Sequence, residues 1–180
     1  MNIVCKLVDL TASYLELFVL YEIYTELFEK NKRRKNIQNR KILVTIVGTI
    51  MIALCNQVSV FSYFTIIICV VYASVSALIL FKANWIPLFS VSSFYILCLS
   101  YFDFFIISIF SYIWGEAEVM QRLSTQGIPR ILLILVVKAL WIMFFLLYKR
   151  HIKVFAQKVT SMYKVLIFSI VGFCGFIFLV

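Results

Sequence analysis

Hydrophobic residues gather in six long runs along the chain, with short polar stretches between them. The runs cover about residues 3–28, 42–55, 58–81, 85–114, 129–148 and 165–180. A transmembrane helix needs about 17–25 residues, and the second run reaches that length only if flanking residues join it. Helices satisfy their own backbone hydrogen bonds in lipid. The pattern therefore predicts an all-α, polytopic integral membrane bundle of six transmembrane helices, which form a single domain over residues 1–180.

The basic residues predict the orientation of this bundle. Seven lie between the first two runs, one follows the third run, and five follow the fifth. They are Lys30, Lys32, Arg33, Arg34, Lys35, Arg40 and Lys41; Lys82; and Lys149, Arg150, Lys153, Lys158 and Lys164. The alternate connections carry only Arg122 and Arg130, near Glu116 and Glu118. Because short loops rich in Lys and Arg stay in the cytoplasm, we expect a multi-pass protein of the cell membrane with its N-terminus outside.

Composition agrees with a membrane location. Hydrophobic residues make up 64% of the chain and charged residues 14%, whereas globular domains average roughly 45–50% and about 25%. The formal net charge of +9 is explained by the basic inner loops. The lipid bilayer is therefore an expected partner, and nucleic acid is not.

No motif for catalysis, metal binding or cofactor binding is found in the sequence. The single histidine, His151, lies among lysines and arginines and is interpreted as a solvated residue. HExxH, GxSxG, P-loop and dinucleotide-binding patterns are absent. The five cysteines show no metal-site spacing and are expected to pack as small apolar residues. We therefore expect no enzymatic activity from these residues, and neither a metal nor a cofactor.

Ionisable side chains inside the apolar runs are the main candidates for function. A charge at that depth costs about 2.5–3.5 kcal/mol on insertion scales, so it needs a partner or a use. At ~1.5 Å per residue, Asp103 lies about 15 Å and Lys138 about 12 Å from the outer ends of their helices. We predict that they form an ion pair, with Glu16 as the competing partner. Such a pair either fixes helix register or couples ligand binding to helix movement, because its energy changes steeply when one helix shifts.

Other polar positions in the runs are expected to serve packing or the inner surface. A stripe in the first run is expected to face the bundle: Lys6, Asp9, Ser13 and Glu16. Three glutamates near its end are expected to pair with the following basic loop: Glu22, Glu26 and Glu29. Small and hydroxylated residues of the second and third runs should allow close helix approach: Gly48, Thr49, Ser62, Thr65, Cys69, Tyr72 and Ser76. The amphipathic stretch 149–164 either lies along the inner leaflet or extends the fifth helix.

The opening LVDLTASYLELFVLYEIYTELFEKNKRRKN resembles the first helix and basic loop of Agr-type sensor histidine kinases. These are Gram-positive receptors with a multi-helix sensor and a GHKL-type ATPase domain. The run QGIPRILLILVVKALWIMFFLLYKR is similar to their fifth helix, with Arg130 and Lys138 at the matching positions, and Asp103 matches a lone acidic residue of the fourth helix. MYKVLIFSIVGFCGFIFLV resembles the sixth helix, and the likeness covers the whole chain without a kinase part.

This resemblance implies a quorum-sensing receptor of a two-component system. The chain would bind an extracellular peptide, often a cyclic thiolactone or lactone, and signal as a homodimer. It would reach a cytoplasmic response regulator only through a kinase domain. From position alone, ligand contact is expected at Trp114, Glu116 and Glu118, and coupling at Glu16, Asp103 and Lys138. Since the sequence stops at Val180 without a polar tail, we expect a longer natural chain.

Three other classes stay open at this point. The first alternative is a six-helix substrate-binding subunit of a membrane transporter, although this chain has only five glycines and would be expected to carry more small residues. A membrane peptidase that processes pheromone precursors needs a Cys/His arrangement on the inner side, and His151 has no inner cysteine nearby in the sequence. The third alternative is a scaffold protein without a ligand.

Overall fold

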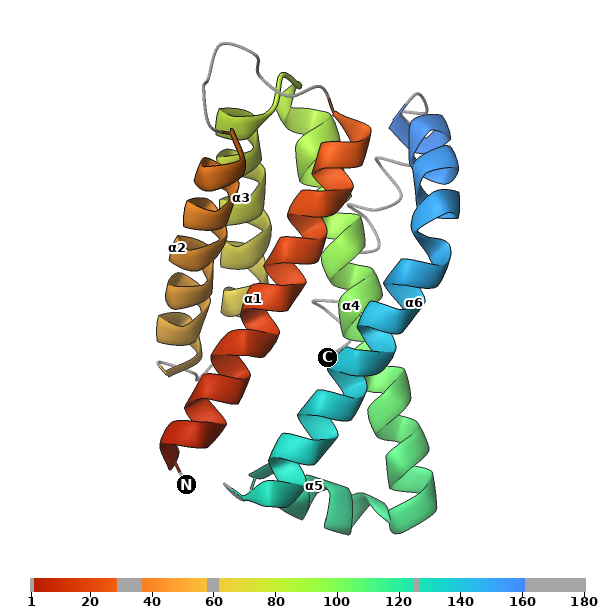
Figure 1. The fold of residues 1–180 in the computed structure, drawn as a ribbon. Coiled ribbons are helices and arrows are strands. Elements are labelled where there is room, and N and C mark those ends of the chain that lie inside the picture. The colour runs from red at the N-terminus through yellow and green to blue at the C-terminus, as the bar shows by residue number, and fades with distance from the viewer. Residues whose placement is uncertain (1, 29–36, 58–61, 125–126, 161–180) are drawn as a thin grey trace.

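A computed structural model describes residues 2–28, 37–57, 62–124 and 127–160 of the chain. These residues form six helices and no strand, so the all-α prediction is confirmed for this part (Figure 1). The helices are α1 (Asn2–Leu27), α2 (Ile37–Gln57), α3 (Ser62–Leu80), α4 (Trp85–Trp114), α5 (Glu116–Ser124) and α6 (Ile128–Thr160). The predicted sixth apolar segment, 165–180, lies outside the described residues.

The observed bounds extend two of the predicted segments. Flanking residues join the short second run at both ends, so α2 covers 21 residues. Helix α6 continues without a break through residues 149–160, which favours the interpretation of that stretch as an extension of the fifth helix. Both prolines of the chain, Pro87 and Pro129, lie in the first turns of α4 and α6, where the missing N–H removes no helical hydrogen bond.

The connection between the fourth and fifth apolar runs, residues 115–128, contains the short helix α5. Gly115 adopts a positive φ of 90° and donates its N–H to the Ser111 carbonyl oxygen at 2.9 Å, which ends α4 and turns the chain. Glu116 and Glu118 then occupy the first turn of α5, where negative charge favours a helix N-terminus. Val119 anchors the helix because its side chain is fully buried.

Three helices are long and apolar enough to cross a membrane. The spans are Gln38–Cys55 within α2, Trp85–Trp114 as the whole of α4, and Ile128–Leu147 within α6. Helix α3 holds a shorter apolar stretch, Thr65–Leu80. Helix α1 carries five charged side chains, which are Lys6, Asp9, Glu16, Glu22 and Glu26. The described structure is therefore a helical membrane bundle with three apolar spans, where the sequence predicted six crossings.

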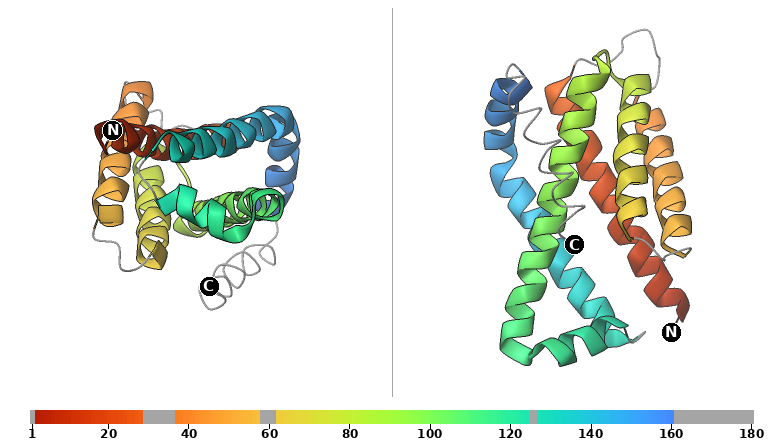
Figure 2. Two further views of the ribbon diagram at one scale, coloured as in Figure 1. Left: turned by 90° about the horizontal axis from the view of Figure 1, so that it is seen from below. Right: turned by 180° about the vertical axis from the view of Figure 1, so that it is seen from behind.

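The helices pack in the order that their short connections predict. Helix α2 packs on α3, and α3 packs on α4. Helix α1 runs diagonally across the bundle and contacts α2 on one side and α6 on the other (Figures 1 and 2). Helices α4, α5 and α6 form a triangle, in which α4 and α6 cross near their middles and diverge toward α5 (Figure 2, right).

The two ends of the bundle differ in charge. The N-terminus and α5 lie at one end, and α1 and α6 run from that end in the same direction (Figure 1). The opposite end holds the start of α2 with Arg40 and Lys41, the turn with Lys82 between α3 and α4, and the final part of α6. The basic stretches that the structure describes are thus gathered at one end.

The core combines apolar side chains with hydroxyl pairs. Leu17, Leu20, Tyr21 and Tyr24 of α1 are buried against residues of α3, α4 and α6. The Tyr24 hydroxyl donates to the Leu88 carbonyl oxygen at 3.0 Å. The Tyr24 hydroxyl also pairs with the Ser92 hydroxyl, and these bonds satisfy polar groups that are buried in the bundle.

Helices α1, α2 and α3 approach closely at Gly48. A Cβ atom added there would lie 2.5 Å from Cε1 of Tyr72 and 2.8 Å from Cδ1 of Leu17. The Tyr72 hydroxyl also donates to the Val44 carbonyl oxygen at 2.7 Å. The predicted packing role of Gly48 and Tyr72 is therefore confirmed.

Candidate functional site

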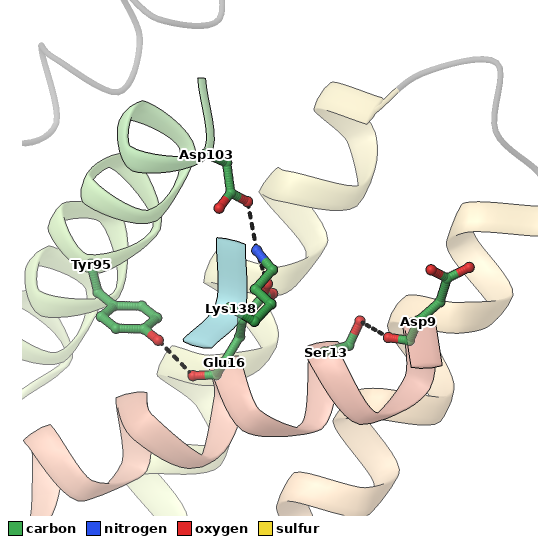
Figure 3. A network of polar contacts seen from close by, with 6 residues as sticks. All are labelled: Asp9, Ser13, Glu16, Tyr95, Asp103 and Lys138. Atoms are coloured by element: carbon green, nitrogen blue, oxygen red, sulfur yellow. Dashed lines mark hydrogen bonds and ion pairs between the residues drawn. The ribbon is translucent and has the colours of Figure 1, made fainter. Parts of the chain in front are cut away.

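Lys138 binds two carboxylates from two different helices. Its Nζ lies 2.6 Å from Oδ2 of Asp103 on α4 and 2.6 Å from Oε1 of Glu16 on α1 (Figure 3). The predicted Asp103–Lys138 ion pair is confirmed. Glu16, expected as a competitor, binds the same ammonium group at the same time. One lysine of α6 thus holds α1 and α4 together.

The network is largely enclosed by the helices. The exposed fractions of the side chains are 14% for Lys138, 24% for Glu16 and 31% for Asp103. The Tyr95 hydroxyl donates to the Glu16 backbone carbonyl oxygen at 2.8 Å, which fixes α4 against α1 beside the charges (Figure 3). In such an environment the attraction between opposite charges is much stronger than in water.

An aromatic cluster packs between α4 and α6 beside Lys138. Trp141 follows one turn later and is buried. Its ring packs against Phe102 with a centroid distance of 5.2 Å and edge-on against Tyr95 at 5.8 Å. Since Phe102 precedes Asp103 directly, this packing sets the separation of α4 and α6 at the level of the ion pairs.

The carboxylates of the network are not fully satisfied. Oδ2 of Asp103 accepts a hydrogen bond from Lys138, but Oδ1 is buried and has no hydrogen-bond partner among the described residues. The two carboxyl groups face one ammonium group. If both were ionised, the network would carry one negative charge in excess.

A second ion pair joins α1 and α6 closer to α5. Nη2 of Arg130 lies 2.9 Å from Oδ2 of Asp9. Asp9 precedes Glu16 by seven residues and Arg130 precedes Lys138 by eight, which is about two helical turns in each helix. Because α1 and α6 run in the same direction, the Asp9–Arg130 and Glu16–Lys138 ion pairs join the same two parallel helices at two positions along their length.

The expected stripe on α1 is only partly buried. Asp9, Ser13 and Glu16 are half-buried, and the Ser13 hydroxyl donates to the Asp9 carbonyl oxygen at 3.1 Å. Lys6 is exposed, so its placement toward the bundle was wrong. It lies in the first turns of α1, where most neighbouring side chains are also exposed.

One predicted ion pair at the opposite end of α1 is confirmed. Glu22 accepts a hydrogen bond from Lys41, a residue of the basic stretch before the second run. The Lys41 ammonium also lies 4.8 Å from the centroid of the Phe18 ring, a favourable cation–π distance. Glu29 lies outside the described residues.

The residues expected to contact ligand lie apart from the network. Trp114, Glu116 and Glu118 are exposed at the corner between α4 and α5. Trp114 stacks on Phe110 at 5.0 Å between ring centroids. Eleven residues of α4 separate Trp114 from Asp103, which is about 16 Å along the axis. The structure therefore divides the six predicted residues into a largely enclosed group of Glu16, Asp103 and Lys138 and an exposed group near α5.

Two parts of this site have no counterpart in the sequence predictions. The partnership of Asp9 with Arg130 depends on α1 and α6 lying side by side, which no local pattern indicates. The Tyr95 contact with the α1 backbone is equally invisible along the chain. Within the residues that the structure covers, no group of three or more His, Cys, Asp or Glu side chains could hold a metal ion.

Comparison of the chain with known protein families, with characterised proteins and with solved structures finds no match. The class of this protein is therefore defined by its fold and its site alone. It is a helical membrane bundle whose first, fourth and last described helices share a largely enclosed ionic network.

Proposed function

We propose that this chain is the transmembrane sensing domain of a two-component sensor histidine kinase in the cell membrane. In this proposal six helices cross the bilayer, the N-terminus and α5 lie outside, and an extracellular peptide binds near α5. The observation that carries the proposal is the position of Lys138 between carboxylates of α1 and α4.

A network of this kind is suited to couple helix movements. If α6 moved by one turn, about 5.4 Å along its axis, the Lys138 ammonium would leave both carboxyl groups, and the largely enclosed charges of the network would lose their partners. Buried pairs therefore favour a small number of discrete arrangements over a continuous range. Ionisable groups at membrane depth are also a frequent mark of function.

The connection of α5 to the network supports the same proposal. Helix α5 joins the diverging ends of α4 and α6, the two helices that carry Asp103 and Lys138 (Figure 2). A ligand bound across this corner acts on both helices at once. The exposed Trp114 supplies apolar contact, and Glu116 and Glu118 supply negative charge for a cationic group. Differential affinity for two positions of α6 would then shift their populations.

The test uses the whole chain in lipid nanodiscs and a library of synthetic cyclic thiolactone and lactone peptides. Binding is measured by the fluorescence anisotropy of labelled peptides, with linear peptides of the same sequences as controls. Trp114→Phe is expected to weaken binding about tenfold, or roughly 1.4 kcal/mol. Trp85→Phe is the matched control, because Trp85 is 40% exposed against 41% for Trp114 but lies at the other end of α4.

Coupling is tested on the same samples. Spin labels near the ends of α1 and α6 report their separation with and without a bound peptide. We expect Lys138→Met to retain peptide binding and to lose the peptide-dependent change in separation. Binding by none of the cyclic peptides, or equal loss of affinity in the Trp85 and Trp114 variants, would refute the proposed function.

A further inference from the structure

The charges of the buried network do not balance. Lys138 contributes one positive charge, and Glu16 and Asp103 contribute two carboxyl groups. Two cations from the helices that pack on α1 are engaged elsewhere, since Arg130 binds Asp9 and Lys41 binds Glu22. An uncompensated charge inside a bundle is costly, because neither water nor a counter-ion screens it there.

Among the residues that the structure describes, the other polar groups beside the network do not supply the missing positive charge. Helix α4 contributes the Tyr95 hydroxyl, which donates to the Glu16 backbone carbonyl oxygen, and the Cys69 thiol of α3 packs against the same core. Phenol and thiol groups are neutral in their protonated forms and become anions when they ionise. Neither can therefore offset a carboxylate.

We propose that the network binds one additional proton, which is shared between the carboxyl groups of Glu16 and Asp103. One carboxyl group is then neutral, the other pairs with Lys138, and the network as a whole carries no net charge. Oδ1 of Asp103, which is buried without a partner, is the open oxygen on which this proton can reside. The proton comes from water, and no bond other than O–H is formed.

The shared proton gives the network two arrangements. With the proton on Asp103, Lys138 pairs with an ionised Glu16 and ties α6 to α1. With the proton on Glu16, Lys138 pairs with an ionised Asp103 and ties α6 to α4. The titration then belongs to the pair of carboxyl groups and not to either one. This inference rests on the geometry of the network alone and holds whether or not a peptide is the ligand.

Infrared spectroscopy of the full chain in lipid nanodiscs tests the proposal. At neutral pH we expect a carbonyl stretching band of a protonated carboxyl group, which shifts in heavy water. Glu16→Gln and Asp103→Asn are each expected to abolish this band, because the remaining carboxylate then pairs one-to-one with Lys138. In Lys138→Met both carboxyl groups take up protons, and the band area should rise about twofold.

Asp9→Asn is the matched control, since it neutralises an acidic residue of α1 that already has its own cation. This variant should leave the band unchanged. The two carboxyl variants change only the charge and not the shape of their side chains, so they remain informative if Lys138→Met fails to fold. Absence of the band in the unmodified chain, or its persistence in both carboxyl variants, would overturn the proposal. So would a band that emerges only when Na⁺ and K⁺ are replaced by choline, because a metal cation would then fill the place of the proton.

Discussion

Replacement of Lys138 by methionine removes the positive charge on which two helices converge. Both carboxylate partners lie 2.6 Å from the ammonium group in the unmodified chain, and the lysine side chain is 14% exposed. Breaking a buried pair by removing one partner costs about 3–5 kcal/mol, because the other charge is left uncompensated. With two carboxyl groups left without their cation, we expect the free energy of unfolding of Lys138→Met to fall by an amount within that range at neutral pH.

The variants Glu16→Gln and Asp103→Asn are expected to lose less stability than Lys138→Met. In each of these variants the lysine keeps one ionic partner. The free energy of unfolding should therefore fall by less than about 1.5 kcal/mol, which is the upper end of the net contribution of an ordinary hydrogen bond. Acid should partly restore the stability of Lys138→Met, because the folded variant holds its two carboxyl groups protonated, whereas the unfolded chain binds these protons only as the pH falls. The single carboxyl variants should show little such recovery.

Stability would be measured by reversible unfolding in mixed micelles of increasing dodecyl sulfate content, followed by circular dichroism. Each variant is compared with the unmodified chain at neutral and acidic pH. If Lys138→Met lost no more stability than Asp103→Asn, or if acid did not restore part of its loss, the network would not hold the helices together as argued.

Three further predictions concern packing and pairing elsewhere in the bundle. Gly48→Ala places a methyl group 2.5 Å from a tyrosine ring atom and should lower the free energy of unfolding by about 1–3 kcal/mol in the same assay; a neutral result would contradict the close approach. Tyr24→Phe removes a buried hydrogen bond and should cost about 1–2 kcal/mol, while Tyr112→Phe, at a position 93% exposed, should cost nothing measurable. Asp9→Asn breaks the partly exposed pair with Arg130 and should cost only about 0–1 kcal/mol in unfolding experiments; a loss as large as that of Lys138→Met would refute the distinction between the two ties.

The features that follow from one-dimensional spacing could be predicted from the sequence. The bounds of α4 agree with the apolar run 85–114, because an uninterrupted apolar run of this length is expected to form a single helix. Counting residues from the helix ends also placed Asp103 and Lys138 at similar depth, and they do form an ion pair. Depth is preserved when antiparallel neighbours pack, so this inference needed no knowledge of the rest of the fold.

The features that depend on lateral arrangement could not be predicted in this way. The pairing of Asp9 with Arg130 requires two helices far apart in sequence to lie side by side. Lys6 shares the helical spacing of Asp9 but lies in a part of α1 where neighbouring side chains are exposed. Helix α5 has the polar composition of a surface loop, and one buried anchor such as Val119 is too weak a signal to mark a helix.

The unbroken course of α6 has a mechanical consequence. Helix α6 covers 33 residues, about 50 Å at 1.5 Å per residue, against a hydrocarbon thickness of about 30 Å. Lys138 lies about 15 Å from its first residue and about 33 Å from its last. If α6 tilts as a rigid body about the position of Lys138, a displacement of about 1 Å at the end beside α5 becomes a displacement of about 2 Å at Thr160. Lys138 lies closer to the α5 end of α6 than to the opposite end. A small movement of α6 beside α5 therefore becomes a larger movement at Thr160.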